Sequence, residues 1–406
     1  MTRFKTVLCC LGAAIFAASV SGSFAWTLRG IYDSNIYTHT DMYSKLRSVE
    51  NVLKNNFLYE YDETKAADYA ALGLSMSIDD PYTVYYNKEQ FTEYTNAASG
   101  DFIGIGIVVF ANKDTDEIEV ESVMDDSPAF LAGVQPGDIL IAIEGEKFTG
   151  SRLTDAVSKI RGSDSDEDVE GTSVTVTVRR NDEEIDLEII RERIHEKTVK
   201  YEMLDDETGY MRISGFNTGY EDEKSTYDEF TDALADLSEK GMKKIIFDVR
   251  DNGGGDLSVV TPMVDRIVPE GLILYAMDKH DNREEIKSDG EELIMPMVVL
   301  VNGNTASAAE LFAGALRDYD KAQIVGTTTY GKGVMQRVFP FSDGSGMTVT
   351  VAKYYTPDGI CVQDEGITPD IICEQNEENK ETPVSSLDSA QDVQLQKAIE
   401  ILNNED

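Results

Sequence analysis

A buried strand, a polar turn and a helix start follow one another in the stretch Met297-Val298-Val299-Leu300-Val301-Asn302-Gly303-Asn304-Thr305-Ala306-Ser307-Ala308-Ala309-Glu310. Its apolar opening predicts a strand buried in a sheet, and a helix is expected from about Ala308 to Leu316. This order places Ser307 at the mouth of the sheet. The amide of Ala308 then lies near a helix N-terminus, where N–H groups lack intrahelical partners and favour a developing oxyanion. The stretch therefore offers a candidate serine nucleophile beside a candidate oxyanion donor.

A second buried strand is predicted upstream at Ile245-Ile246-Phe247-Asp248-Val249, and it runs into Arg250-Asp251-Asn252-Gly253-Gly254-Gly255. The glycine run can supply another backbone amide to the same oxyanion. Because glycine has no Cβ, Gly253 or Gly254 would let a substrate approach the backbone closely.

Lys332 stands 25 residues after Ser307, in the glycine-flanked stretch Thr329-Tyr330-Gly331-Lys332-Gly333. A free lysine has a pKa near 10.4 and is a poor base at neutral pH, but burial in an apolar pocket disfavours the ammonium and lowers that pKa. A neutral lysine would take the serine proton during attack on a carbonyl. Ser307 and Lys332 are thus a candidate nucleophile and base.

A histidine-dependent triad is a weaker alternative. The three histidines, His39, His195 and His280, stand in no recognisable catalytic context. The pattern Gly-x-Ser-x-Gly is also absent around Ser307.

A nucleotide site is a second alternative, because Gly326 to Lys332 matches Gly-x4-Gly-Lys. The next residue is Gly333, however, where a phosphate-binding loop needs Ser or Thr for magnesium, and the residues that follow predict a strand. Taken in isolation, Ser307 and Lys332 could also be ordinary polar loop residues. The rest of the chain decides between these interpretations.

Residues 99–190 predict strands, turns and short helices in the order of a PDZ domain. Phe102 to Phe110 is an apolar strand opened by alternating glycines, and Ser127-Pro128-Ala129 starts a helix. The run ends in the turn and strand Gly137-Asp138-Ile139-Leu140. This order resembles a PDZ domain, and the segment from Ser127 to Leu140 is its most specific part.

The PDZ resemblance implies a groove in which a peptide adds as a strand. The backbone amides near Ile103, Gly104 and Ile105 would then meet the terminal carboxylate of the peptide. Gly104 and Gly106 suit that place, because close backbone approach leaves no room for a side chain.

Residues 1–28 predict a signal peptide or a membrane anchor. Arg3 and Lys5 form a positive start, and Val7 to Ala18 is apolar or small throughout. No charge occurs between Lys5 and Arg29, which is long enough for a spanning helix. Either interpretation puts the rest of the chain outside the cytoplasm, in the cell envelope or secreted.

Residues 37–98 predict a helical region, in which Leu46, Val49, Val52 and Leu53 recur at helical spacing. The formal net charge of −40 argues against nucleic acid as a partner. The acidic loop from Ser163 to Gly171 lacks the glycine and glutamate of a calcium loop. We therefore expect no metal, and the predicted chemistry needs no cofactor.

Further motifs complete the pattern: Asp80-Pro81-Tyr82-Thr83, Tyr355-Thr356-Pro357-Asp358-Gly359 and Gly366-Ile367-Thr368-Pro369-Asp370-Ile371. Together with the PDZ-like module, the Ser307 turn and the Lys332 stretch, they resemble the carboxyl-terminal processing proteases, a family of tail-specific serine proteases. The resemblance covers about residues 40 to 400. It implies a mixed α+β multidomain chain with a helical element, a PDZ domain and a crotonase-like α/β protease core at 191–375.

The same resemblance implies roles for single residues. Ser307 would be the nucleophile, Lys332 the general base and Gln336 the residue that orients the lysine. Many members of the family carry proline at the position of Gly253, so Gly254 is favoured, with Ala308, as the oxyanion hole. Arg161, at the end of a predicted PDZ helix, would sense a filled peptide groove, although it could also simply stabilise that helix end.

The resemblance further implies a serine endopeptidase acting on unfolded or tail-exposed polypeptides. The alternative function is a non-catalytic peptide-binding scaffold on the same fold. Residues 376–406 predict an acidic linker and an amphipathic helix from Asp392 to Leu402. This helix would either mediate a homodimer or pack on the core of its own chain.

Overall fold

The computed structural model describes residues 41–406, except 113–114, 125, 163–168, 196, 220–222, 380–381, 383 and 405–406. The predicted signal peptide or anchor at 1–28 lies outside the described residues, and so does most of the acidic loop. Within the described part of the chain, no helix is long and apolar enough to cross a membrane. The chain divides into two compact units, and the boundary between them in the sequence lies between Asp79 and Asp80.

The first unit contains the helices α3 (Met42–Asn56) and α4 (Glu63–Met76). Asp41 caps α3 by accepting a hydrogen bond from Ser44 N, and Asp62 caps α4 in the same way. The predicted helical region extended to residue 98, but the second unit already begins at Asp80. There the chain forms the strand β1 (Val84–Tyr86), which pairs with a strand far along the sequence.

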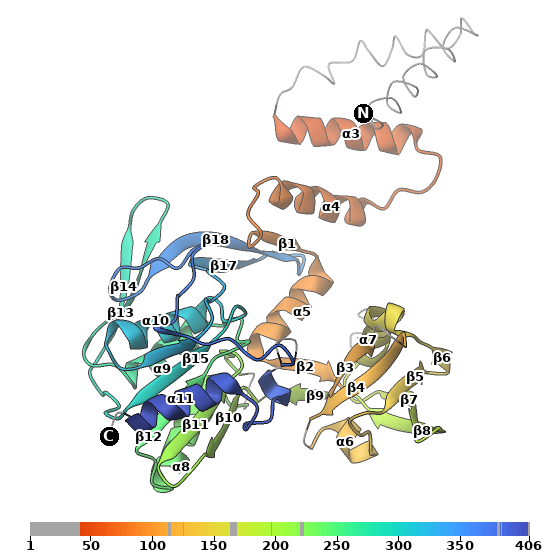
Figure 1. Ribbon diagram of the computed structural model, residues 1–406. Coiled ribbons are helices and arrows are strands. Elements are labelled where there is room, and N and C mark those ends of the chain that lie inside the picture. The colour runs from red at the N-terminus through yellow and green to blue at the C-terminus, as the bar shows by residue number, and fades with distance from the viewer. Residues whose placement is uncertain are drawn as a thin grey trace, which may run out of the picture. The chain divides into compact units, whose positions relative to one another are not determined.

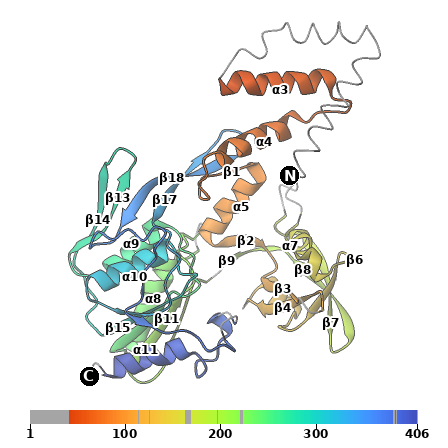
Figure 2. The same cartoon turned by 45° about the horizontal axis from the view of Figure 1, so that its top comes forward.

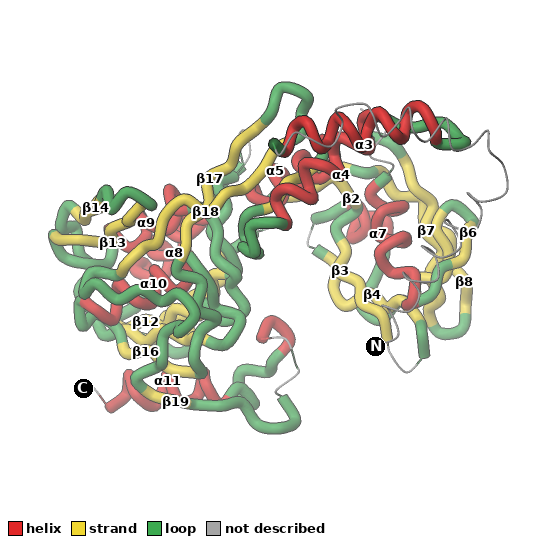
Figure 3. Tube along the Cα trace, turned by 90° about the horizontal axis from the view of Figure 1, so that it is seen from above, coloured by secondary structure: helices red, strands yellow, loops and turns green. Residues whose placement is uncertain are grey.

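One domain of the second unit has the predicted PDZ architecture. Its antiparallel sheet has the order β3-β4-β5-β7-β8, with α7 beside it (Figure 3) and α6 in contact with β8. Its apolar core includes Ile118, Leu140 and Val176, which are almost completely buried. The elements are β3 (Ile107–Asn112), β4 (Glu117–Val123), α6 (Pro128–Ala132), β5 (Ile139–Ile143), β6 (Glu146–Lys147), α7 (Leu153–Arg161), β7 (Ser173–Arg180) and β8 (Glu183–Ile190).

The other domain is built on a six-stranded sheet of order β10-β11-β12-β15-β16-β19. All neighbours are parallel except β10 and β11, so the carboxyl ends of five strands meet at one edge. The strands are β10 (Val199–Met203), β11 (Thr208–Ile213), β12 (Lys244–Asp248), β15 (Met297–Val301), β16 (Gln323–Gly326) and β19 (Ile371–Ile372). Every residue of β12 and β15 is buried, and this includes Lys244 and Asp248 at the two ends of β12.

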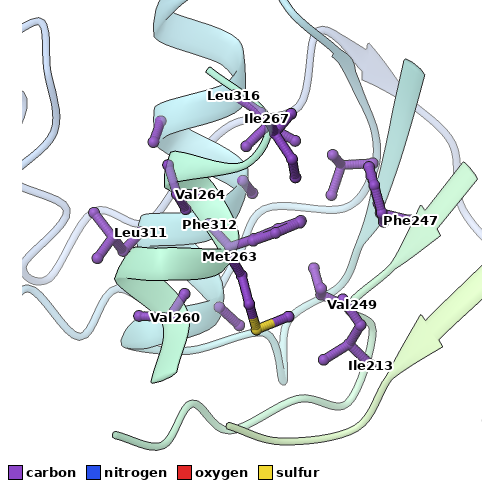
Figure 4. Close-up of a cluster of buried hydrophobic side chains, with 14 of the residues drawn as sticks. Ile213, Phe247, Val249, Val260, Met263, Val264, Ile267, Leu311, Phe312 and Leu316 are labelled. Carbon is purple, nitrogen blue, oxygen red and sulfur yellow. The ribbon is translucent and has the colours of Figure 1, made fainter. Parts of the chain in front are cut away.

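Helices cover both faces of this sheet. One face packs against α8 (Thr226–Glu239), α9 (Leu257–Asp265) and α10 (Ala308–Asp318), where Phe312 meets Phe247 edge-on with ring centroids 5.4 Å apart (Figure 4). The helix α11 (Val393–Asn404) lies on the opposite face (Figures 1 and 2). Its residues Leu395 and Leu402 are buried against the sheet. The apolar stripe of the C-terminal helix therefore packs on its own core, and the structure gives no support to a homodimer through it.

A second sheet has the order β1-β18-β13-β14, and β17 pairs with β18. Its strands are β13 (Gly271–Asp278), β14 (Arg283–Ser288), β17 (Val334–Pro340) and β18 (Gly346–Tyr355). The helix α5 (Lys88–Ser99) packs against β18, and a Cβ on Gly346 would lie only 2.3 Å from the ring of Phe91. Glycine at this position lets the helix approach the strand.

Candidate active site

Ser307 occupies the strained turn between β15 and α10. It is the N-cap residue of α10, with φ +55° and ψ −118°, a backbone conformation that residues with a Cβ rarely adopt. A hydrogen bond to the residue after β12 holds the turn, because Thr305 Oγ1 donates to Val249 O at 2.8 Å. The strand, turn and helix predicted around Ser307 are thus present, and the hydroxyl stands at the carboxyl edge of the parallel sheet.

Glu310 joins the serine turn to the lysine stretch. Its carboxylate is completely buried. One oxygen, Oε2, accepts from Ser307 N at 2.8 Å and from Lys332 N at 2.9 Å. The other, Oε1, accepts from Thr329 Oγ1 at 2.6 Å and from Gly331 N at 2.8 Å. Sequence reasoning missed this residue, although an acid between small residues in the first turn of a buried helix was a usable signal.

Tyr354, on β18, makes a second link between the same two backbones. Its hydroxyl lies 2.9 Å from Ser307 O and 3.1 Å from Lys332 O, and donates to them. Burial raises the pKa of Tyr354 well above its ordinary value, so the hydroxyl keeps its proton. Glu310 and Tyr354 therefore hold the Ser307 and Lys332 backbones together by hydrogen bonds.

The side chain of Lys332 is half-buried, and its Nζ lies 4.7 Å from the centroid of the Tyr82 ring. Burial lowers the pKa of Lys332, while the negative charges of Asp80 and Glu310 oppose that shift. The structure thus holds the backbones of the candidate base and the candidate nucleophile together and lowers the pKa of Lys332. The two side chains form no hydrogen bond with each other in the described residues.

The segment from Asp80 to Thr83 lies next to the side chain of Lys332. Thr83 Oγ1 donates to Asp80 Oδ2 at 2.6 Å and accepts from Thr350 N at 3.1 Å, which ties the segment to β18. Burial and a hydrogen bond with Tyr330 raise the pKa of Tyr82 to about 12, so the ring next to Lys332 is neutral. The sequence resemblance pointed to this motif but assigned it no role.

Among the described residues, no hydrogen bond joins Gln336 to Lys332. Gln336 Nε2 donates to Thr350 Oγ1 at 3.3 Å. Lys332 precedes β17, and the register of β17 against β18 shifts between Met335 and Gln336. The two residues therefore do not follow the regular alternation of side chains along one strand.

Gly254 and Ala308 both lie next to Ser307. A Cβ on Gly254 would be 2.9 Å from Ser307 Cβ and 3.2 Å from Ala308 N, and its φ of +108° also favours glycine. The N–H of Gly254, however, donates to Asn252 Oδ1 at 2.8 Å. The two predicted oxyanion donors are therefore adjacent, and one of them is engaged within the chain.

Ile103 and Gly104 do not lie on the exposed edge of the PDZ sheet. They belong to β2 (Asp101–Gly104), which pairs with β9 (Glu192–His195) in a separate two-stranded ribbon. Ile105 is buried, and its carbonyl accepts from Ala129 N at 2.8 Å. The PDZ sheet has β3 at one edge and β8 at the other, and β3 begins after these three residues in the chain.

Arg161 ends α7, as the sequence predicts. Its guanidinium lies 5.6 Å from the centroid of the Phe102 ring on β2. The carbonyl groups at the end of α7 are bound by another arginine, because Arg191 Nε donates to Ile160 O at 2.6 Å and Arg191 Nη2 to Lys159 O at 3.1 Å. Arg161 is therefore left to contact the ribbon, and its role as a sensor of the groove stays a prediction.

Within the described residues, no group of three His, Cys, Asp or Glu side chains could hold a metal ion. Cys361 and Cys373 are unpaired thiols and half-buried. Burial raises the pKa of Cys373, which keeps this thiol protonated.

Sequence comparison shows the family of the core. Residues 207–373 match the profile described as Peptidase family S41, and residues 119–180 match a PDZ domain. The core of this chain belongs to peptidase family S41. The resemblance to the carboxyl-terminal processing proteases and the predicted fold class, a PDZ domain with an α/β S41 core, are thereby confirmed.

Two curated relatives of this chain have the same name. The chain is 36% identical over 332 residues to a "Probable CtpA-like serine protease" of Staphylococcus aureus (strain COL), which covers 81% of this chain and 64% of the relative. It is 34% identical over 331 residues to a protein of the same name from Staphylococcus epidermidis, covering 80% and 64%. The chain thus spans less than two thirds of the length of these curated relatives.

A solved structure shares the fold. A putative S41 protease from Bacteroides fragilis is 17% identical, with a TM-score of 0.57, and the match covers 81% of this chain and 88% of that one. At this identity the likeness concerns the fold alone.

The first prediction from this geometry concerns Glu310. In Glu310→Gln, one acceptor oxygen becomes an NH2 group that must face two hydrogen-bond donors, whichever way the amide turns. We expect the free energy of unfolding to fall by about 2–3 kcal/mol, because buried donors lose a charged partner. We expect kcat to fall about 100-fold, because a misplacement near 1 Å has this effect.

Denaturant unfolding and peptide turnover measure these two effects. The exposed Glu239→Gln on α8 is the matched control and should change neither. Wild-type turnover in Glu310→Gln would show that the carboxylate does not position the site.

Proposed function

We propose that this chain is an exported serine endopeptidase in which Ser307 is the nucleophile and Lys332 the general base. The observation that carries the proposal is the buried Glu310 carboxylate, which binds the backbone N–H groups of both residues. The lowered pKa of Lys332 supports it, because it raises the fraction of neutral amine at a given pH.

The proton transfers follow from these positions. Neutral Lys332 takes the proton from Ser307 Oγ as the oxygen attacks a peptide carbonyl, and the C–N bond breaks as the ammonium returns that proton to the leaving amine. Lys332 then takes a proton from the water that attacks the acyl-enzyme. The ester bond to Ser307 Oγ breaks, the ammonium returns that proton to Oγ, and the new carboxyl end is released. The N–H of Ala308, at the start of α10, stabilises the oxyanion in both steps.

Gly254 N–H joins this oxyanion hole when it leaves Asn252 Oδ1. The catalytic arrangement therefore differs from the described site in two respects: Lys332 Nζ must reach Ser307 Oγ, and the Gly254 amide must turn. Gly254 already lies next to Ser307, so its amide needs only to leave Asn252 Oδ1. We assign Gln336 no contact with the base.

A cleavage assay distinguishes this function from a non-catalytic peptide-binding scaffold. Purified protein with residues 1–40 removed should hydrolyse unfolded casein, and a fluorophosphonate should label Ser307. Peptide binding without cleavage or labelling would favour the scaffold. Export is part of the proposal because of the charge and hydropathy pattern of residues 1–28.

The second prediction concerns selection by the substrate tail. We expect a PDZ domain next to an S41 core to capture a free apolar C-terminus along β3, and the protease to cut upstream of it. An unfolded substrate with a free apolar tail should have a KM about tenfold lower than the amidated substrate, which lacks the charged hydrogen bonds of the carboxylate. It should also have a lower KM than the substrate ending in Asp-Asp, which lacks the apolar contact of the tail. Equal KM values for the three tails would mean that the PDZ domain does not select by the tail.

A further inference from the structure

The strand β17 borders its sheet. It pairs with β18 through residues 334–340, and no other strand among the described residues pairs with its second edge. It begins two residues after Lys332. An edge strand of this length exposes backbone groups that can pair with another chain. Its position next to the site makes the direction of these groups important.

The pairing of β18 shows which groups of β17 point outward. Residues of an antiparallel strand direct their N–H and C=O alternately to the two sides. Thr350 N donates to Thr83 Oγ1, on the side away from β17, while Ser345 O accepts from Phe341 N on the side of the β17 connection. The backbone N–H and C=O groups of Thr350 and Thr348 therefore point away from β17. The backbone groups of the β17 residues paired with them point to the free edge of β17.

The partners of Thr350 and Thr348 are Gln336 and Val338. Both therefore present an N–H donor and a C=O acceptor at the free edge. The next residue with this direction is Pro340, which has no N–H. Natural edge strands are closed by prolines of this kind. Here the proline closes the far end only, and the part of the edge next to Lys332 is open.

The open edge continues directly from the catalytic residues. Gly333, between Lys332 and β17, is fixed on both sides: its N–H donates to Gln363 Oε1 at 2.9 Å and its C=O accepts from Tyr354 N at 3.0 Å. The same tyrosine holds the carbonyls of Ser307 and Lys332. The strand edge is thus rigidly connected to the nucleophile, as a surface that aligns a substrate must be.

We propose that β17 is the docking edge for the substrate, which adds to it as an extended strand and is thereby aligned with Ser307. The occupant is an unfolded polypeptide segment, bound through its main chain at Gln336 and Val338. This inference rests on the proposed function and adds how the substrate is held at the site, separately from the capture of its tail. Main-chain pairing favours unfolded segments of many sequences, since only an extended backbone can supply the hydrogen bonds.

The contact covers a defined length. The five residues after the register shift, 336–340, extend over about 17 Å, at roughly 3.4 Å per residue. Side chains of the substrate alternate between the two faces of the added strand, and the exposed Val338 and Phe339 lie on opposite faces of β17. We expect peptides that reach only two or three residues along the edge to be poor substrates.

Backbone ester substitution tests the proposal in the wild-type protein. The probe is a cleavable peptide of about twelve residues, amidated at its C-terminus to exclude capture of a free tail. One amide N–H at a time is replaced by an ester oxygen. On one side of the cleaved bond, KM should rise about threefold to tenfold at alternate positions and little at the positions between. A KM that is the same for all esters, or that changes without alternation, overturns the proposal.

A change in the strand supplies a second test. Val338→Pro removes one outward N–H at an edge position where proline is tolerated, and Val338→Thr is the matched variant that keeps it. KM for the amidated peptide should rise about threefold to tenfold in the proline variant only. If light scattering instead shows that Val338→Pro breaks a dimer while KM is unchanged, the edge pairs with a second copy and the proposal is wrong.

Substrate docking on β17 and catalysis by Ser307 can be tested independently of each other. Binding of the same ester series to Ser307→Ala, followed by fluorescence anisotropy, needs no catalysis. Alternating Kd values without any cleavage by the wild type would retain the docking edge and refute the protease. Cleavage by the wild type with Kd values that are equal along the peptide would do the reverse.

Discussion

Ser307→Ala should lower the hydrolysis of unfolded casein by at least about 10⁴-fold, since removal of a nucleophile leaves only the other parts of the site. The hydroxyl is half-buried, and no protein hydrogen bond donated by Oγ is present among the described residues. The variant should therefore fold and bind peptide. Casein turnover and fluorophosphonate labelling measure the loss. Cleavage at the wild-type rate would refute the assignment of the nucleophile.

Ser307→Gly separates strain from chemistry at the same position. It should be equally inactive, but more stable than Ser307→Ala by roughly 1 kcal/mol, because glycine adopts a φ of +55° at little cost. Denaturant unfolding of the two variants measures the difference. Equal stabilities would mean that the turn stores no strain at Ser307.

Lys332→Arg should be inactive although it keeps the positive charge. A guanidinium does not lose its proton in proteins, so the variant has no base for the Ser307 hydroxyl. We expect kcat/KM to fall by about 10²- to 10⁴-fold, the usual contribution of a general base. Lys353→Arg, at an exposed position on β18, is the matched control and should be active. Comparable activity of the two variants would remove Lys332 from the mechanism.

The rate of hydrolysis by the wild type should depend on pH through the deprotonation of Lys332. Because burial lowers the pKa of Lys332, the neutral amine increases as pH rises through a value below the ordinary 10.5. The rate should therefore rise with pH across that lowered pKa and level off above it. A rate that is flat between about pH 5 and 9 would contradict a lysine base that titrates in this window.

Removing the Asp80 carboxylate should move that profile. Its charge opposes the lowering of the Lys332 pKa, so Asp80→Asn should shift the rising limb of the rate to lower pH. Asp80 accepts from Tyr82 N through Oδ1 and from Thr83 Oγ1 through Oδ2, and the single amide oxygen of asparagine replaces only one of these two acceptors. A shift to higher pH would show that Asp80 acts on Lys332 by position and not by charge.

Local patterns were sufficient where neighbours in sequence form the structure. The strand before Ser307 and the helix after it follow from a run of apolar residues and a polar turn, and the order of PDZ elements follows in the same way. The family motifs then led to the S41 core, which the comparisons confirm. The candidate Ser307 and Lys332 needed no distance information, because their residue types and surrounding glycines distinguish them.

The sequence by itself thus determined the fold class and the two candidate residues, whereas the tertiary structure decided what each group does. Gln336 binds Thr350 because of a register shift, Ile103 pairs with β9, and Glu310 binds donors 19 to 22 residues away in the chain. These contacts depend on which distant strands pair and in what register. A one-residue slip in a strand turns every side chain to the other face, and nothing in a local pattern specifies it.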